Sequence, residues 1–376
     1  NAGSLPCPPL RQAIVCSYAC SGRICTGIDS LIGFEVFVIS EHQLGQPQGH
    51  RMRIFLTGAS GFVGGAFAAA FHQQHEILAM SRSEQSDAVI RARGITPVRC
   101  ELGTVRAEQL LGCAAVVHCA AHVEQWGRRE DFMRITVEGT RQLLQVARAA
   151  GVPRFVHISS EAALLHGQSL QNIDERYPYP QRHTFIYSES KAEAEKLVLA
   201  ANAPGQFETL ALRPRMIWGP GDLSILPVLL QMVHEGRFMW LNGGRARTST
   251  THIANLLQAM DLALSQGRGG QAYFITDETI STFREFLTAL LATQGVHAPD
   301  KSLPGWLARG LGRLLESTWR LLGITAEPPL THFAAAVMSR ECTLDISKAR
   351  RELGYNPVIS VSRGLAELPK RLVILP

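Results

Sequence analysis

From Met52 onward, short apolar runs alternate with amphipathic segments of helical period. The apolar runs lie at 53–57, 76–81, 114–120, 154–159 and 208–213, and helical patterns lie between them at 62–73, 84–93, 130–150 and 187–201. Apolar runs of this kind indicate strands that are covered on both faces, and a helix between consecutive strands indicates parallel pairing. The pattern therefore predicts an α/β fold with a Rossmann-type, doubly wound parallel sheet.

Residues 1–51 do not share this pattern. They hold Pro- and Cys-rich patches and one short apolar run, without the leading charges and cleavage site of a targeting segment. We expect an extension that is poorly ordered and has no role in the fold.

The composition argues against several kinds of partner. Lys and Arg number 37 against 32 Asp and Glu, a formal net charge of +5, and no basic run is interleaved with aromatic residues, so nucleic acid is not expected. No apolar stretch reaches the roughly 20 residues that a membrane-spanning helix needs. The eight cysteines form no metal-type cluster with histidines, and the histidines at 118, 122, 157 and 252 are dispersed. We therefore expect reduced thiols, a cytoplasmic location and no metal ion.

The first predicted strand runs into a turn with three spaced glycines, "TGASGFVGG" from Thr57 to Gly65. Without Cβ atoms, Gly58, Gly61 and Gly64 permit a tight turn and let backbone amides approach a pyrophosphate, and the N-terminus of the following helix adds unpaired N–H groups. The alternative is a glycine-rich turn without a ligand. Because strand, turn and helix occur in the required order, the sequence favours dinucleotide binding.

A tyrosine and a lysine stand four residues apart in "FIYSESKAEAE", Phe185 to Glu195. At this spacing Tyr187 and Lys191 share one face of a helix, one turn apart. A solvated helix face would account for the same pair, so its meaning depends on the motifs elsewhere in the chain.

Those motifs resemble the extended short-chain dehydrogenase/reductase superfamily (the NAD-dependent epimerase/dehydratase family), most closely its 3β-hydroxysteroid dehydrogenase-like branch. The resemblance rests on the glycine turn, "YSESK" and four further stretches, namely "VVHCAAH" (116–122), "VEGTRQLLQVARAAGVPRFVHISS" (137–160), "LRPRMIWGPGD" (212–222) and "DISKARRELGYNP" (345–357). It implies an NAD(P)-dependent dehydrogenase or reductase that acts on CH–OH groups. It further implies an NAD(P)-binding domain over 52–218, to which 245–280 returns, and a smaller substrate-binding domain over 219–244 and 281–376.

The resemblance also implies a Ser-Tyr-Lys site. Tyr187 would be the general acid/base at the substrate oxygen, Lys191 would lower the pKa of the phenol and hold the cofactor ribose, and Ser160 would polarise the oxygen, with Ser159 as the second candidate. Thr136 stands where the family commonly has Asn, which puts a proton relay through this position in doubt. Cofactor contacts are expected from Thr57, Gly58, Ser60, Gly61, Phe62, Val63, Gly64, Arg82, Cys119, Ala120, Ala121, Tyr187, Lys191 and Pro214.

The end of the second strand bears on the choice of cofactor. NAD-preferring sites usually place Asp or Glu there, but this chain reads "EILAMSRSEQSD", and the nearest acid, Glu84, is expected to cap the next helix. Arg82 could pair with a ribose 2′-phosphate, which predicts a preference for NADP(H) with NAD(H) as the second cofactor. The alternative is that Arg82 stacks on adenine or points to solvent.

The substrate is expected to be small and hydrophobic: sterol-like, terpenoid or a long-chain β-hydroxy or β-keto compound. Met216 stands where related sugar-nucleotide enzymes carry a diphosphate-binding Asn, and a thioether suits an apolar ligand better. The amphipathic, arginine-containing segment 303–323 either packs on its own domain, contacts a membrane surface or caps a lipid-like ligand. A homodimer is the assembly that the resemblance implies. A nucleotide-sugar epimerase or dehydratase and a non-catalytic dinucleotide sensor are the alternative functions.

Overall fold

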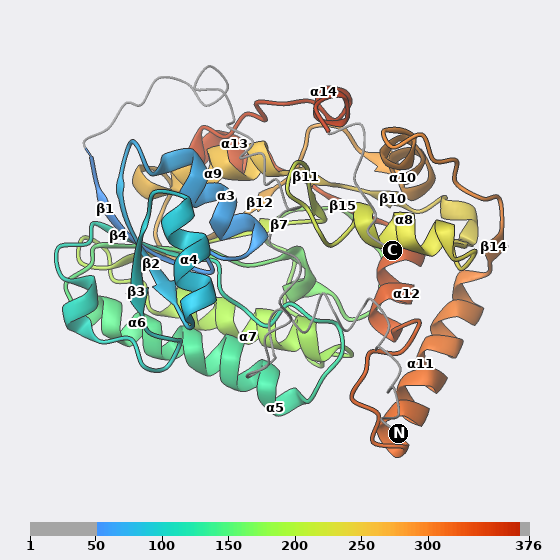
Figure 1. Ribbon diagram of the computed structural model, residues 1–376, viewed down its shortest axis with the longest axis horizontal. Helices are drawn as coiled ribbons and strands as arrows, with labels where there is room; N and C mark the ends of the chain where they lie inside the picture. The colour runs from blue at the N-terminus through green and yellow to red at the C-terminus, as the bar shows by residue number, and fades with distance from the viewer. Residues whose placement is uncertain (1–50, 369–376) are drawn as a thin grey trace, which may run out of the picture.

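The computed structural model describes residues 51–368, and its centre is a seven-stranded parallel sheet (Figure 1). In the order β12-β7-β5-β4-β1-β2-β3, its strands are β12 (Gln271–Ile275), β7 (Glu208–Pro214), β5 (Arg154–Ile158), β4 (Ala115–His118), β1 (Arg53–Thr57), β2 (Glu76–Ser81) and β3 (Thr96–Arg99). The Rossmann-type sheet predicted from the sequence is thereby confirmed. The expectation of a poorly ordered extension falls, except for residue 51, outside the described residues.

Helices cover both faces of this sheet, and the alternation of strand side chains explains why. In β1, Ile54 and Leu56 point into one apolar core and Phe55 into the other. The first core is completed by α3 (Phe62–Phe71), α4 (Glu84–Ala92) and α9 (Ile253–Ser265), and the second by α6 (Gly139–Ala149) and α7 (Ile186–Ala200). The helix expected at 130–150 consists of α5 (Arg129–Phe132), a π-helical turn (Met133–Glu138) and α6.

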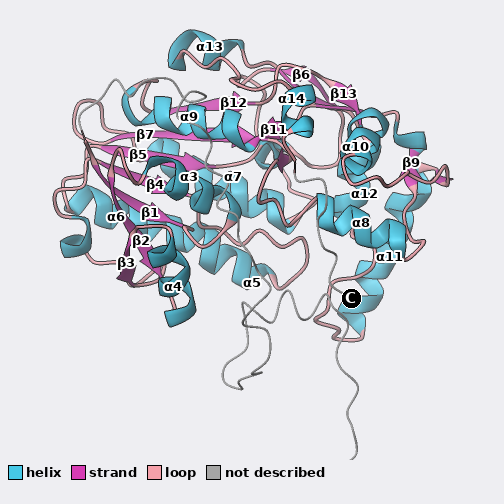
Figure 2. Ribbon diagram, turned by 45° about the horizontal axis from the view of Figure 1, so that its top comes forward, coloured by secondary structure: helices cyan, strands magenta, loops and turns pink. Residues whose placement is uncertain are grey.

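A smaller lobe lies beyond the carboxyl end of the sheet (Figure 2). It contains a four-stranded sheet in the order β13-β10-β15-β6 and two short strand pairs, β11 with β8 and β14 with β9. Its strands are β6 (Leu170–Ile173), β8 (Ile217–Trp218), β9 (Trp240–Leu241), β10 (Arg247–Thr248), β11 (Thr251–His252), β13 (Ser281–Thr282), β14 (Ser302–Leu303) and β15 (Cys342–Leu344). The later helices are α8 (Leu226–His234), α10 (Phe283–Ala292), α11 (Gly305–Leu321), α12 (His332–Ser339), α13 (Ser347–Leu353) and α14 (Val361–Ala366).

Helix α11 packs through its small residues. Its buried positions are Gly305, Ala308 and Gly312, and a Cβ at Gly312 would lie 3.0 Å from the backbone of α12. The large apolar side chains point outward, with Trp306 69% and Leu321 87% exposed. Within residues 51–368, no helix is long and apolar enough to span a membrane. Contact of this exposed apolar face with a membrane surface stays a prediction.

Candidate active site

The turn between β1 and α3 requires glycine at two positions, because of its backbone conformation and because there is no space for a Cβ. Gly58 has φ +78°, and a Cβ at Gly64 would lie 2.4 Å from the Gly58 carbonyl oxygen. No side chain caps the N-terminus of α3 at Gly61, and its first turn holds no acidic residue. The turn therefore presents uncapped backbone N–H groups at a positive helix end, and this donor set fits a pyrophosphate.

The end of β4 lies directly beside this turn. A Cβ at Gly58 would lie 3.0 Å from the backbone N of Ala120, and that N donates to Thr57 Oγ1 over 3.1 Å. Thr57 Oγ1 also lies 2.7 Å from His118 Nδ1, so β1 and β4 are tied together where both strands end. The predicted cofactor residues fall into this one region. Ser60, Phe62 and Val63 lie in the turn or first turn of α3, Cys119, Ala120 and Ala121 follow β4, and Pro214 ends β7.

The three predicted catalytic residues meet at the end of β5. Ser160 caps the 3-10 turn that follows this strand (Glu161–Leu164), and Tyr187 and Lys191 lie in the first turns of α7. The Tyr187 phenol lies close enough to Ser160 for the serine to lower its pKa. Lys191 is buried, and its Nζ donates to the backbone oxygen of Ile158 over 3.0 Å.

The pKa of Tyr187 is shifted in the direction opposite to the one expected. Burial raises the pKa of the phenol, the negative charge of Glu161 raises it further, and Ser160 lowers it. The ammonium of Lys191 is directed at Ile158 instead, and burial lowers its own pKa to about 8. The expected lowering combines the charge of Lys191 with that of an oxidised nicotinamide, and it stays a prediction.

The two candidate serines face different surroundings. Ser159 continues the pairing of β5, because its backbone N donates to the Leu212 oxygen over 2.8 Å. Its hydroxyl is buried beside Glu195, whose pKa it helps to lower. Of the two, Ser160 is the one that lies close to the Tyr187 phenol.

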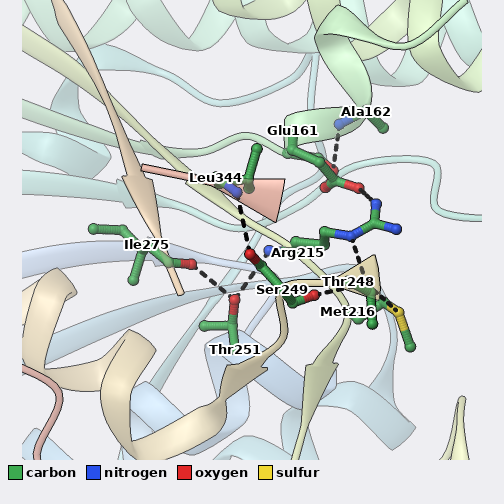
Figure 3. Close-up of polar contacts among 10 residues, drawn as sticks. Glu161, Ala162, Arg215, Met216, Thr248, Ser249, Thr251, Ile275 and Leu344 are labelled. Carbon is green, nitrogen blue, oxygen red and sulfur yellow. Dashed lines mark hydrogen bonds and ion pairs between the residues drawn. The ribbon is translucent and has the colours of Figure 1, made fainter. Parts of the chain in front are cut away.

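A buried ion pair next to Ser160 was missed by the sequence reasoning. The Ser160 hydroxyl donates to Glu161 Oε2 over 2.7 Å, and Arg215 Nη1 donates to Glu161 Oε1 over 2.5 Å. Arg215 Nε also donates to Thr248 Oγ1 of β10 over 3.0 Å, so the pair links the serine to the small sheet (Figure 3). An unusual pair of charged residues in otherwise apolar strand-end segments was the available signal, since buried charges are rare unless paired.

Two residues that depart from the family pattern, Thr136 and Met216, make defined contacts. Thr136 lies in the π-helical turn, and its Oγ1 accepts a hydrogen bond from the backbone N of His122 over 3.0 Å, so it holds the chain that follows β4. Met216 has a positive φ of 43°, packs against the apolar core of the smaller lobe, and its sulfur lies 3.7 Å from Thr248 Oγ1. A thioether rather than an amide therefore stands beside Arg215.

Arg82 is exposed directly after β2. The next helix is capped by Ser83, whose hydroxyl accepts from the backbone N of Ser86 over 3.2 Å, and Glu84 is the first residue of α4. The cap expected from Glu84 is thus made by its neighbour, because a short hydroxyl at the N-cap position reaches the free amides of the first turn.

Comparisons with known proteins agree with this geometry. The model of the 3-beta hydroxysteroid dehydrogenase/isomerase family matches residues 55–305. The chain is 41% identical over 323 residues to a 4-hydroxy-2-methyl-3-oxo-4-farnesyl-3,4-dihydroquinoline-1-oxide ketoreductase of Stigmatella aurantiaca, covering 84% of this chain and 96% of the relative. It is 34% identical to a 2-alkyl-3-oxoalkanoate reductase of Stenotrophomonas maltophilia (strain K279a), covering 84% and 98%.

Among solved structures, the fold is similar to that of the UDP-glucuronic acid 4-epimerase from Bacillus cereus in complex with NAD. The TM-score is 0.65 at 18% sequence identity, and the match covers 84% of this chain and 96% of the epimerase. The structural likeness concerns the fold, whereas the family model and the sequence relatives identify the family. The chain belongs to the 3-beta hydroxysteroid dehydrogenase/isomerase family of oxidoreductases.

Proposed function

We propose that this protein interconverts a ketone and a secondary alcohol on a hydrophobic substrate, with NADP(H) as the preferred cofactor. The observation that carries the proposal is the meeting of Ser160, Tyr187 and Lys191 at the carboxyl end of β5, beside the glycine turn. The named relatives support the reaction type, since both are reductases of keto compounds.

The chain's own residues would bind the dinucleotide and handle the proton. Residues 57–64 and 119–121 would hold the pyrophosphate region, and Lys191 would hold the ribose. When bound, the nicotinamide supplies or accepts the hydride. Ser160 orients the substrate oxygen, and Tyr187 gives it a proton in reduction or removes one in oxidation.

The surroundings of Tyr187 support an apolar substrate. The ring of Phe333, from α12, contacts the tyrosine ring edge-on with centroids 5.4 Å apart, and Phe333 also contacts Phe185 at 5.3 Å. Met216, whose sulfur lies 3.7 Å from Thr248 Oγ1, follows Arg215 in place of an amide. These groups offer dispersion contacts rather than hydrogen bonds, which favours a sterol-like, terpenoid or long-chain substrate over a nucleotide sugar.

Tyr187→Phe tests the proposed role of the phenol. The variant is expected to bind NADPH with wild-type affinity and to lose roughly 10²–10⁴-fold in turnover, because only the proton-transfer group is removed. Steady-state kinetics with a panel of hydrophobic ketones and NADPH fluorescence titration measure both quantities, with Ser159→Ala as the matched control. Near-wild-type kcat in Tyr187→Phe would contradict the mechanism. Wild-type binding of NADPH without turnover of any ketone or alcohol would favour the sensor, and turnover of a UDP-sugar would favour the epimerase.

Arg82 is the proposed determinant of NADP(H) preference. A guanidinium can form charge-assisted hydrogen bonds with the 2′-phosphate. Arg82→Ala is expected to lower kcat/KM for NADPH about 10- to 100-fold, the effect of a lost charged hydrogen bond, and to leave NADH almost unchanged. Arg91→Ala, which removes an exposed arginine of α4, is the control. A wild type that favours NADH, or unchanged discrimination in Arg82→Ala, would refute the assignment.

A further inference from the structure

A cavity of about 290 Å³ lies between α11, α12 and the loop after the 3-10 turn Glu161–Leu164. Arginine and histidine side chains dominate its lining, together with one tryptophan: Arg309, Arg313, Arg340, His166, His332 and Trp306. None of the three arginines forms an ion pair with a carboxylate in the part of the chain that the structure describes. The cavity is therefore strongly positive.

The arginines are held in place by neutral partners. Arg309 Nη1 donates to Ser339 Oγ over 2.8 Å, and Arg313 Nε donates to His332 Nε2 over 3.1 Å. Arg340 Nε is buried and has no hydrogen-bond partner among the described residues. Like charges confined to one cavity repel one another. In accord with this, the pKa of His332 is lowered to about 4 by burial and by Arg313, Arg309 and Arg340, so its ring is neutral and can accept from Arg313.

One layer of aromatic rings joins this cavity to the catalytic tyrosine. The His332 ring lies 5.0 Å from that of Phe185, Phe185 lies 5.3 Å from Phe333, and Phe333 lies 5.4 Å from Tyr187, all between centroids. The cavity therefore lies across one apolar layer from Tyr187.

We propose that the arginine cavity binds an anionic group, a carboxylate or a phosphate, carried by the hydrophobic substrate. The inference rests on the proposed function, because it takes Tyr187 as the reacting end of the site. Paired or clustered guanidinium groups recognise both anions through charge-assisted hydrogen bonds, and an anion here would relieve the repulsion and satisfy Arg340. The structure favours a bound ligand over lipid headgroups, because Arg309 and Arg313 donate to side chains of α12, whereas Leu314 and Leu321 are exposed.

The test compares an acid with its uncharged ester. Reduction of 11-oxododecanoate, whose carbonyl and carboxylate lie at opposite ends of the chain, and of its methyl ester is measured for the wild type, Arg313→Gln, Arg340→Gln and the control Arg320→Gln. Arg320 lies on the same helix but over the Trp126 ring, 5.4 Å from its centroid, and outside the cavity lining. We expect the wild type to prefer the acid at least tenfold. Each cavity variant should lose about 10- to 100-fold in kcat/KM for the acid, mainly through KM, with the ester almost unaffected. Arg320→Gln should change neither.

A binding measurement tests the anion site independently of the proposed reaction. Titration calorimetry with dodecanoate and dodecyl phosphate, in the presence of NADPH, should give affinities that fall in the Arg313 and Arg340 variants, and the tighter ligand identifies the anion. If no ketone is reduced but this arginine-dependent binding remains, the reaction proposal fails and the anion site stands.

Other results would overturn the anion site. An equal kcat/KM of the wild type for the acid and the ester would overturn it. An equal loss of kcat/KM for both substrates in the cavity variants would do the same. Arginine-dependent binding of UDP-glucuronic acid without binding of the alkyl anions would assign the cavity to a sugar nucleotide. Arginine-dependent binding to vesicles of phosphatidylglycerol without binding of the soluble anions would assign it to a membrane.

Discussion

At the scale of single residues, the buried Glu161 places a negative charge close to the phenol of Tyr187. Its carboxylate raises the pKa of Tyr187 and accepts the hydrogen bond of Ser160. Glu161→Gln keeps an acceptor for Arg215 but removes the negative charge, so the pKa of Tyr187 falls. Because alcohol oxidation needs the phenolate, the pH at which kcat/KM for oxidation is half-maximal should move to lower values. An unchanged or higher pH midpoint would contradict this role.

The control for this pH profile is Glu193→Gln, which removes a carboxylate from the surface of α7, the helix of Tyr187, where it pairs with Lys196 over 2.8 Å. Solvent screens a charge at the surface, so the midpoint should not move. Removal of a buried partner of Arg215 also lowers stability, by up to about 3–5 kcal/mol for a buried pair left incomplete. Activity is therefore measured at a temperature where both variants are folded.

Local spacing explains which site residues could be predicted from the sequence. Tyr187 and Lys191 lie one helical turn apart, and the glycines lie within one turn, so short motifs contain them. Glu161 and Arg215 are 54 residues apart, and only the tertiary fold brings them together. The direction of the Tyr187 pKa shift could not be predicted either, because it depends on where the Lys191 ammonium points.

At the scale of elements, the glycine turn sets the position of α3 against β1. Gly64→Ala would force its Cβ to 2.4 Å from the Gly58 oxygen, a backbone atom that cannot move without displacing the turn. Such overpacking costs about 1–3 kcal/mol of unfolding free energy. We also expect at least a tenfold weaker affinity for NADPH, because the displaced amides no longer fit the pyrophosphate.

Gly310→Ala is the matched control for this change. Gly310 lies within α11 with no atom within 4 Å of an added Cβ. Alanine at an exposed position inside a helix should stabilise it by roughly 0.5–1 kcal/mol and leave NADPH binding unchanged. Thermal unfolding and NADPH titration check both variants. Wild-type stability and affinity in Gly64→Ala would show that the turn can relax.

The elements that could be predicted are those long enough to show the periodicity of a strand or a helix. The five apolar runs and four helical patterns all correspond to strands or helices of the main sheet layer. The strands of the smaller lobe are two to four residues long, too short to show an alternation. Helix α11 was predicted as an amphipathic segment, but not which residues it buries: close approach to α12 selects the glycines and Ala308, and Trp306 and Leu321 stay exposed.

At the scale of the whole molecule, both lobes contribute residues to the site. The parallel sheet and its helices provide the glycine turn and the proposed catalytic residues, whereas the smaller lobe provides Phe333, Thr248 and the arginine cavity. The Glu161–Arg215 pair joins the lobes directly behind Ser160. A change at this junction should therefore alter both stability and the geometry of the reacting groups.

Buried histidines make the whole fold sensitive to acid. Burial lowers the pKa of His118 to about 3, that of His252 to about 4, and that of His157 well below its usual value. Below pH 6.5 the unfolded chain takes up protons at these residues and the folded chain does not, so the free energy of unfolding falls as the pH falls. These three groups contribute roughly 4 kcal/mol of the loss between pH 7.5 and 5.5, and His332 adds to it.

His157→Phe isolates this effect from other groups, including Asp277, whose raised pKa acts in the opposite direction. Both ring nitrogens of His157 lack a hydrogen-bond partner among the described residues, so the substitution removes one titrating group and no hydrogen bond. The loss of unfolding free energy between pH 7.5 and 5.5 should shrink by about 1.4 kcal/mol, one histidine's share. Urea unfolding at the two pH values measures the difference. If the variant and the wild type lose equal amounts, His157 takes up its proton in the folded protein as readily as in the unfolded chain.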